Sequence, residues 1–293
     1  MTDGDNDPVK PAPFVYHAPK TVGDAVAKLA EFGPLDGRVL AGGQSLVPMM
    51  AFRMARPTHL VDINAVAGLD RLAVDGDMLS IAACVRHAAF HRPVVPGPTG
   101  ALLAAVVSNI AHYPIRLRGT FCGSLAHADP ASEWCLTAVT LGADIVAASS
   151  RGRRVIAADD YFEGMMATAL AEDELVLEAR VPLLAADTRF GFYEFSRRAG
   201  DYALAMALVT FRLQDGIIVE PRVGVGGAEA RPRRISEAEA ALAGRKPNTE
   251  SFRAAAEAAA DVIDPLEDVH ADAEFRLDLV RAVTRRALER ALA

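Results

Sequence analysis

A glycine pair placed directly after a short strand most constrains the architecture of this chain. The segment Arg38–Leu40 has the composition of a strand, and it runs directly into Ala41-Gly42-Gly43-Gln44-Ser45-Leu46. Glycine lets the backbone adopt positive φ and approach a bound group closely. Successive amides can therefore converge on a diphosphate, with the Ser45 hydroxyl as a further donor. An ordinary turn after a strand has the same composition, so this segment alone leaves both interpretations open.

A second glycine-containing segment, Thr120-Phe121-Cys122-Gly123-Ser124, is expected to form a loop. We expect that loop to end where a helix starts, with Asp129 as cap, Pro130 at the first helical position and Glu133 in the first turn. A helix start offers free N–H groups and a positive dipole end to an anion. Neither segment contains G-x-G-x-x-G or G-K-[ST]. Together they predict a nucleotide cofactor held by two separated segments, in an architecture other than a Rossmann or P-loop fold.

Composition and charge bound the function classes. The chain has 293 residues, 51% of them hydrophobic, so two or three packed units are expected. Its net charge of -7 disfavours nucleic acid as a partner. The acidic stretch Met1–Pro8 lacks the features of a secretory signal, and we expect no transmembrane segment and a cytoplasmic location.

Cysteines and histidines predict no metal centre. The three cysteines, Cys84, Cys122 and Cys135, lie at wide and unequal spacings, so no disulfide framework and no iron-sulfur or zinc ligand set is expected. The short pair His87 and His91 falls in a predicted helical turn and forms no HExxH or HxH motif.

The pattern of elements along the chain predicts an α+β fold. Thr21 and Gly33 are expected to bound the first helix, as N-cap and as terminator. Further helices are expected at 101–110, 129–142, 236–243, 249–262 and 273–292. Strands are expected at 38–40, 60–63, 72–74, 78–81, 144–148, 154–157, 203–213, 217–219 and 222–225. A change of texture near residue 185 predicts a domain boundary there.

Three motifs carry a resemblance to a known family. They are Ala41–Leu46, the long segment from Ile110 to Glu133, and Arg197-Arg198-Ala199-Gly200-Asp201-Tyr202-Ala203. In this order and spacing they resemble the FAD-binding medium subunits of molybdenum hydroxylases, the xanthine dehydrogenase and aerobic carbon monoxide dehydrogenase superfamily. The resemblance covers nearly the whole chain.

The resemblance implies both the fold and the cofactor site. The expected fold is a two-part, vanillyl-alcohol-oxidase-like (PCMH-type) FAD-binding domain over 1–184, with subdomains at about 1–65 and 66–184. A smaller α+β C-terminal domain of the CO dehydrogenase flavoprotein type is expected over 185–293. No residue of this chain is expected to be catalytic or to bind a metal. The residues implied to bind FAD are Leu40, Ala41, Gly42, Gly43, Gln44, Ser45, Leu46, Ile110, Thr120, Gly123, Ser124, Asp129, Glu133 and Tyr202.

Several motif residues keep an alternative role. Glu133 falls where the family has an acid reaching the ribityl hydroxyls, but it also suits the first turn of a helix. Tyr202 falls beside the expected flavin ring, or it is a core aromatic of a strand. The pair Arg197 and Arg198 could orient FAD or a partner, or form a solvated turn. His127 could approach the cofactor, or be satisfied by backbone.

Cys122 departs from the family pattern, which has T-x-G-G where this chain has Thr120-Phe121-Cys122-Gly123. Either this position adopts negative φ, or the loop is displaced and binds FAD less tightly. The thiol could also lie exposed at the cofactor.

The resemblance implies an oxidoreductase that relays electrons. A large molybdenum-pterin subunit would oxidise the organic substrate, and a small subunit would carry two two-iron, two-sulfur clusters. This chain's FAD would collect the electrons for an external acceptor, in a heterohexamer that is a dimer of heterotrimers. Two alternatives are a free-standing FAD-dependent oxidoreductase with its own small substrate, and a non-catalytic assembly subunit that has lost FAD.

Overall fold

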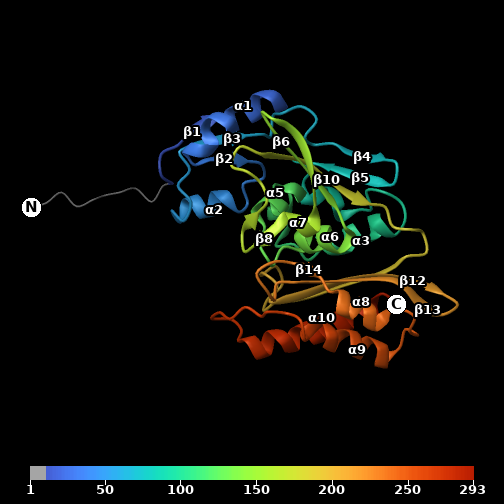
Figure 1. Cartoon of the computed structure of the whole chain (residues 1–293). Coiled ribbons are helices and arrows are strands. Elements are labelled where there is room, and N and C mark those ends of the chain that lie inside the picture. The colour runs from blue at the N-terminus through green and yellow to red at the C-terminus, as the bar shows by residue number, and fades with distance from the viewer. Residues whose placement is uncertain (1–10) are drawn as a thin grey trace, which may run out of the picture.

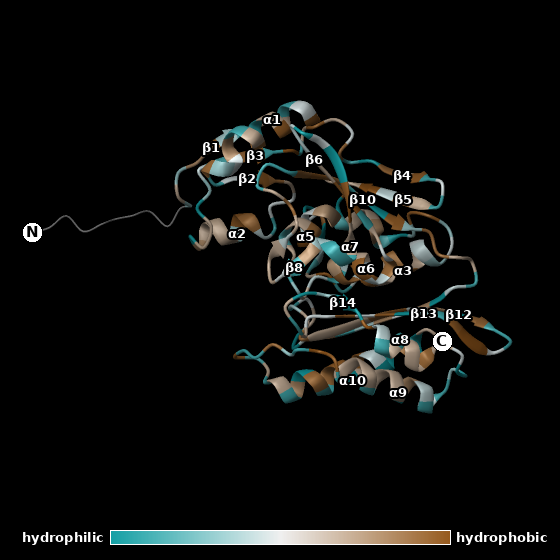
Figure 2. Cartoon of the chain, viewed as in Figure 1, coloured by the Kyte–Doolittle hydropathy of each residue, from teal (hydrophilic) through white to brown (hydrophobic). Residues whose placement is uncertain are grey.

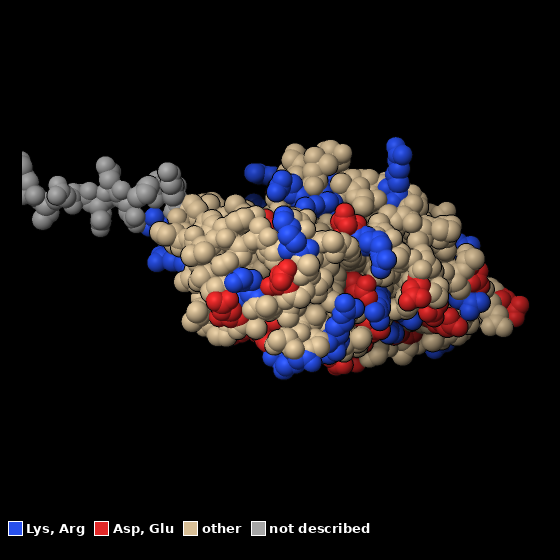
Figure 3. Space-filling view, turned by 90° about the horizontal axis from the view of Figure 1, so that it is seen from above, with Lys and Arg blue, Asp and Glu red and all other residues tan. Residues whose placement is uncertain are grey.

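A computed structural model describes residues 11–293. The stretch Met1–Pro8, which bears on the expectation of no secretory signal, lies outside these residues. Sheets and helices alternate in layers (Figure 1). No helix within residues 11–293 is long and apolar enough to cross a membrane. On the face seen in Figure 3, basic and acidic side chains are interspersed rather than segregated by sign.

A small parallel sheet forms the N-terminal part, in the order β1-β3-β2. Its strands are β1 (Val15–His17), β2 (Gly37–Leu40) and β3 (His59–Asp62). The Thr21 hydroxyl caps α1 (Val22–Phe32) by accepting from the Asp24 amide at 3.1 Å, as the sequence predicts. The short helices η1 (Gly33–Leu35) and α2 (Leu46–Ala51) complete this part. Helix α1 also contacts the next sheet and so joins the two.

The second sheet has five antiparallel strands in the order β4-β5-β10-β6-β7. The predicted strands at 72–74 and 78–81 pair as one hairpin, and those at 144–148 and 154–157 pair as another. The strands are β4 (Leu72–Asp75), β5 (Met78–Ala82), β6 (Asp144–Ser149), β7 (Gly152–Ala157) and β10 (Leu175–Pro182). The central strand β10 is missing from the sequence prediction. Its charged residues Glu178 and Arg180 suggest a loop, but they pair with each other at 2.7 Å, and Glu178 also accepts from Ser80.

Helices α3 and α6 form a middle layer between the five-stranded sheet and the C-terminal sheet. Both are mostly apolar around their circumference (Figure 2), as expected for helices covered on several sides. The elements of this region are η2 (His87–His91), α3 (Pro98–Val107), α4 (Tyr113–Arg116), α5 (Phe121–His127), α6 (Glu133–Leu141), α7 (Ala158–Tyr161), β8 (Phe162–Gly164) and β9 (Ala167–Thr168).

The C-terminal part is an antiparallel sheet covered by three helices on the face away from α6. Its order is β11-β12-β13-β14. The elements are β11 (Arg189–Phe195), β12 (Ala205–Gln214), β13 (Ile217–Gly226), β14 (Arg233–Arg234), α8 (Ser236–Leu242), α9 (Thr249–Ala260) and α10 (Ala273–Arg290). The two strands predicted at 217–225 are one strand, because Glu220 at φ 50° before Pro221 marks an irregularity rather than an end. Strand β11 is also missing from the prediction.

Two apolar cores underlie these layers. One core is built from residues up to Leu208, and the other from residues between Leu204 and Ala291. They meet along β12, whose residues contribute to both. We propose that the domain boundary lies near residue 185, in the connection between β10 and β11.

Candidate functional site

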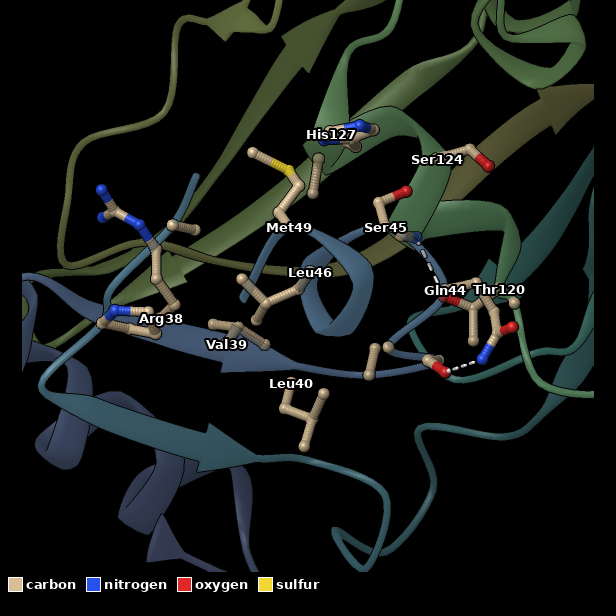
Figure 4. A pocket seen from close by; sticks show the side chains of 18 of the residues that line it. Arg38, Val39, Leu40, Gln44, Ser45, Leu46, Met49, Thr120, Ser124 and His127 are labelled. Carbon is tan, nitrogen blue, oxygen red and sulfur yellow. Dashed lines mark hydrogen bonds between the residues drawn. The ribbon is translucent and has the colours of Figure 1, made fainter. Parts of the chain in front are cut away.

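A cavity of about 530 Å³ lies where β2 runs into α2, facing the start of α5. Its walls include the whole first glycine segment with Leu40 before it, and Thr120, Gly123 and Ser124 of the second segment with Gly119 before it. The hydroxyl side chains of Ser45, Thr120 and Ser124 gather toward one end, and Arg38 lies at the other (Figure 4). The two segments, about eighty residues apart in sequence, therefore share one cavity.

The two glycines of the first segment have different structural roles. A Cβ on Gly42 would lie 2.4 Å from the carbonyl oxygen of Arg118 and 2.7 Å from the Cα of Gly119, so a side chain would collide with the backbone of the other segment. Gly43 has φ 71°, a conformation that favours glycine. Gly42 therefore permits the close approach of the two segments, and Gly43 makes the turn that leads into α2.

Two side chains hold the segments in register. The Asn64 amide donates to the carbonyl oxygen of Ala41 at 2.8 Å, and the Arg86 guanidinium donates to the Asn64 side-chain oxygen at 2.6 Å. Arg86 also donates to the carbonyl oxygen of Arg118. This chain of contacts links one segment to the other. Sequence reasoning missed both residues, although a polar side chain just after β3 was the available signal.

The second segment is a helix start rather than a loop, so the predicted loop is wrong there. Thr120 is the N-cap of α5, and its hydroxyl oxygen accepts from the Gly123 amide at 3.0 Å. Gly123 is typical of a loop, but Thr three residues before it is a strong N-cap. The Thr120 hydroxyl proton remains free to bind an acceptor in the cavity.

Cys122 lies inside α5 with negative φ, so the alternative in which this position tolerates a side chain holds. Its thiol is buried and contacts the carbonyl oxygen of Ile81 at 3.3 Å. Burial raises the pKa of this thiol. The suggestion of a thiol exposed at the cofactor is therefore wrong, and the side chain replaces the family glycine without entering the cavity.

Four of the implied FAD residues do not line the cavity: Ile110, Asp129, Glu133 and Tyr202. Ile110 is buried in the first core. Residues outside the implied set also line it, among them Arg38, Met49, Met54, Arg56, His87, His127 and Met166. Arg197, which could have oriented FAD, does not line the cavity either, and its guanidinium lies 3.1 Å from His270 Nδ1.

The helix expected to start at Asp129 starts four residues later, at Glu133. Asp129 accepts from the Ala131 amide at 2.9 Å, and its carbonyl oxygen accepts from the Ser132 amide. Asp followed by Pro suits the first two positions of a type I turn as well as a helix start. Here the turn forms, and Ser132 becomes the N-cap.

A carboxyl pair lies at the junction of α6 and β11. Glu133 and Glu194 are within hydrogen-bonding reach of each other, and Glu194 Oε2 is buried without a donor among residues 11–293. Burial, aided by the facing carboxyl, raises the pKa of Glu194, and burial raises the pKa of Glu133. One of the two groups therefore keeps a proton near neutral pH, which supplies the missing hydrogen bond.

Tyr202 belongs to the same neighbourhood. Its side chain is 70% exposed, so the core-aromatic alternative is wrong. Partial desolvation of the hydroxyl and the nearby carboxylates of Asp129 and Glu133 raise the pKa of Tyr202. Three of the four implied residues outside the cavity, Asp129, Glu133 and Tyr202, thus form a second cluster, in which the Tyr202 ring is exposed.

The carboxyl pair should make stability depend on pH. Because the folded-state pKa values are raised, the pair's contribution to stability is fully present below the ordinary glutamate pKa and is lost as pH rises through the raised values. We expect the free energy of unfolding of Glu194→Gln to fall less with rising pH than that of the unchanged protein. At alkaline pH it should be about 1 kcal/mol higher. Thermal unfolding of the FAD-free chain at several pH values checks this. The exposed control Glu163→Gln should keep the original dependence, and parallel curves for all three proteins would contradict the assignment.

Comparison with known proteins gives a consistent match across the chain. Residues 12–184 match the family model described as the FAD binding domain in molybdopterin dehydrogenase, and residues 190–291 match the CO dehydrogenase flavoprotein C-terminal domain. The nicotine 6-hydroxylase medium subunit of Paenarthrobacter nicotinovorans is 38% identical over 93% of this chain and 95% of its own length. The carbon monoxide dehydrogenase medium chain of Hydrogenophaga pseudoflava is 34% identical over 97% and 98%.

Solved structures agree with this match. Carbon monoxide dehydrogenase from Hydrogenophaga pseudoflava, in a form lacking the Mo-pyranopterin moiety, superposes with a TM-score of 0.92 at 36% identity, covering 96% of this chain and 98% of that chain. Quinoline 2-oxidoreductase from Pseudomonas putida 86 gives 0.89 at 35% identity, covering 97% and 98%. The expected fold, a PCMH-type FAD-binding domain followed by a C-terminal domain, is confirmed. The chain belongs to the family of FAD-binding medium subunits of molybdenum hydroxylases, and it is an oxidoreductase subunit.

Proposed function

We propose that this chain holds FAD across its two glycine segments and passes electrons from iron-sulfur clusters of a partner subunit to an external acceptor. The observation that carries the proposal is the packing of Gly42 against the backbone of Arg118 and Gly119, which brings both segments to one cavity. Converging backbone amides and hydroxyl donors suit a diphosphate. FAD, when bound, can take electrons singly and deliver one or two.

The residues of this chain would bind and orient the cofactor. We propose that the cavity residues Leu40–Leu46, Thr120, Gly123 and Ser124 hold the diphosphate portion. The second cluster, with Asp129, Glu133 and Tyr202, would then lie toward the flavin portion, with Ile110 in the packed wall behind it. A carboxylate can accept two hydrogen bonds from neighbouring hydroxyls, which suits Glu133 to a polyol chain.

The proposed assembly contains two further kinds of subunit. A large subunit would hold molybdenum-pterin and a small one two two-iron, two-sulfur clusters, in a cytoplasmic dimer of heterotrimers. Support comes from relatives that are medium subunits or medium chains over nearly their whole length. The relatives are subunits named for nicotine 6-hydroxylase, carbon monoxide dehydrogenase and caffeine dehydrogenase. Such different substrates at similar identity support substrate selection in another subunit.

Visible spectroscopy of the purified chain tests the function. We expect flavin absorbance in the chain alone, and no bleaching when small organic substrates are added without air. Bleaching should require the two partner subunits, because no residue here is proposed to act on substrate. The chain should therefore be measured alone and after co-expression with a large molybdenum-pterin subunit and a small iron-sulfur subunit.

The two alternatives predict different spectra. Bleaching of the isolated chain by an organic substrate would favour a free-standing oxidoreductase. A colourless protein in both preparations, with no gain on adding FAD, would favour an assembly subunit without cofactor.

A further inference from the structure

His87 lies against the second glycine segment and has no assigned role. It is the first residue of η2, and its amide donates to the carbonyl oxygen of Gly119 at 2.9 Å. The side chain is only 4% exposed, yet it lines the cavity. A buried polar ring at the wall of a cavity needs hydrogen-bond partners for both nitrogens.

The neighbouring tryptophan fixes the proton on this ring. Trp134 Nε1 lies 2.9 Å from His87 Nδ1. An indole N–H can only donate, so Nδ1 is the acceptor and carries no proton. The fully buried Trp134 is itself held by Phe90 and Phe121, with ring centroids 5.2 and 4.8 Å away.

The ring is also neutral under cellular conditions. Burial, and then the positive charges of Arg116 and Arg86, lower the pKa of His87 to about 3. A neutral imidazole has one proton. Since Nδ1 has none, the proton is on Nε2, and that nitrogen is a hydrogen-bond donor.

The donor on Nε2 has no acceptor within residues 11–293. A Cβ on Gly119 would lie 2.5 Å from this nitrogen, so glycine at that position leaves it uncovered. Gly119 and Thr120 line the same cavity. Nε2 is not among the fully buried polar atoms that lack a partner in the described part of the chain, so this nitrogen is reached from the cavity and can donate to a ligand acceptor there.

We propose that His87 binds FAD as a neutral donor, its Nε2–H directed to a diphosphate oxygen beside Gly119 and Thr120. This inference rests on the proposed function. A diphosphate oxygen only accepts, and it is anionic, so a fixed donor suits it without any change of protonation. Trp134 would act as a positioning residue, because it sets the tautomer without touching the ligand.

Two conservative variants separate the ring nitrogens. In His87→Gln the amide nitrogen takes the place of Nε2 and can still donate, whereas His87→Asn reaches only toward Trp134. Titration of the FAD-free full chain with ADP and with adenosine isolates the diphosphate, since both ligands share the adenosine. We expect His87→Asn to weaken ADP and FAD binding about 10-fold or more, with adenosine binding unchanged, and His87→Gln to stay within about 3-fold.

Unchanged adenosine binding also shows that the variant site is folded. Equal losses for ADP and adenosine, or ADP binding by His87→Asn equal to that of the unchanged protein, would overturn the proposal. The ratio of the ADP dissociation constant of His87→Asn to that of the unchanged protein should stay constant from about pH 5 to pH 8. A loss of ADP affinity that grows as pH falls would mean that the His87 ring is cationic.

Nitrogen-15 NMR of the histidine ring reads the tautomer directly in the chain without FAD. The Nε2–H form is expected, and an Nδ1–H form would overturn the inference. If the unchanged protein shows the Nε2–H form but binds no FAD, the proposed function is refuted although the tautomer of His87 is as inferred. If the unchanged protein binds FAD, and His87→Asn and His87→Gln bind ADP and FAD with equal affinity, only the proposed role of His87 is refuted.

Discussion

Gly42→Ala is expected to purify without FAD. The added methyl group would lie 2.4 Å from the Arg118 carbonyl oxygen, and both colliding groups are backbone, so the two segments must separate. Overpacking of this kind costs about 1–3 kcal/mol, and here the strain falls on the contact that forms the cavity. We expect at least about a 10-fold loss of FAD affinity, measured as flavin content after purification and by titration of the FAD-free chain.

Gly164→Ala is the matched control. Gly164 has no heavy atom within 4 Å of an added Cβ, and it does not have positive φ. The Gly164→Ala variant should keep the flavin content and the Tm of the unchanged protein. Full flavin content in Gly42→Ala would show that the approach of the two segments does not form the FAD site.

Gly43→Val should also remove FAD, through backbone conformation. Gly43 has φ 71°, which costs a residue with a side chain about 1–2 kcal/mol, and a β-branched side chain more. The new Cβ would be 3.1 Å from Val47 Cγ2. The turn before α2 is expected to change, which withdraws the amides of Gln44 and Ser45 from the cavity. Flavin content and the FAD dissociation constant report the effect.

The control for Gly43→Val must share its conformation. Gly68 has φ 81° and nothing within 4 Å of an added Cβ, and it is exposed. Gly68→Val should lower Tm by an amount similar to Gly43→Val but retain FAD. Equal flavin loss in both variants would attribute the effect to general destabilisation and remove Gly43 from the site.

Local signals predicted the parts of the fold that depend on local chemistry. The Thr21 cap of α1 and the end of α6 at Gly142 follow from capping rules alone. The strand Arg38–Leu40 that leads into the first glycine segment was equally predictable, whereas its sequence alone left the role of Gly42 and Gly43 open. These elements depend on neighbours within a few residues.

The errors arose where distant contacts decide between two local solutions. Asp129-Pro130 suits a helix start or a type I turn, and the Gly227 amide donating to the carbonyl oxygen of Pro130 belongs to the turn. Strand β10 looks polar until Ser80 of β5 is placed beside Glu178. His87 carried no motif at all, since its role depends on Trp134, 47 positions away.

The middle layer has a consequence for the evolution and engineering of such subunits. Thr140 of α6 packs so closely on Gly224 of β13 that a Cβ there would be 1.9 Å from its hydroxyl oxygen, and Thr140 is fully buried. Helix α6 begins at Glu133 and packs against both the five-stranded sheet and the C-terminal sheet. Its side chains must therefore fit both sheets. The C-terminal part therefore cannot be exchanged between relatives independently of α6. Recombination between relatives at residue 185 would have to carry compatible α6 and β13 surfaces together.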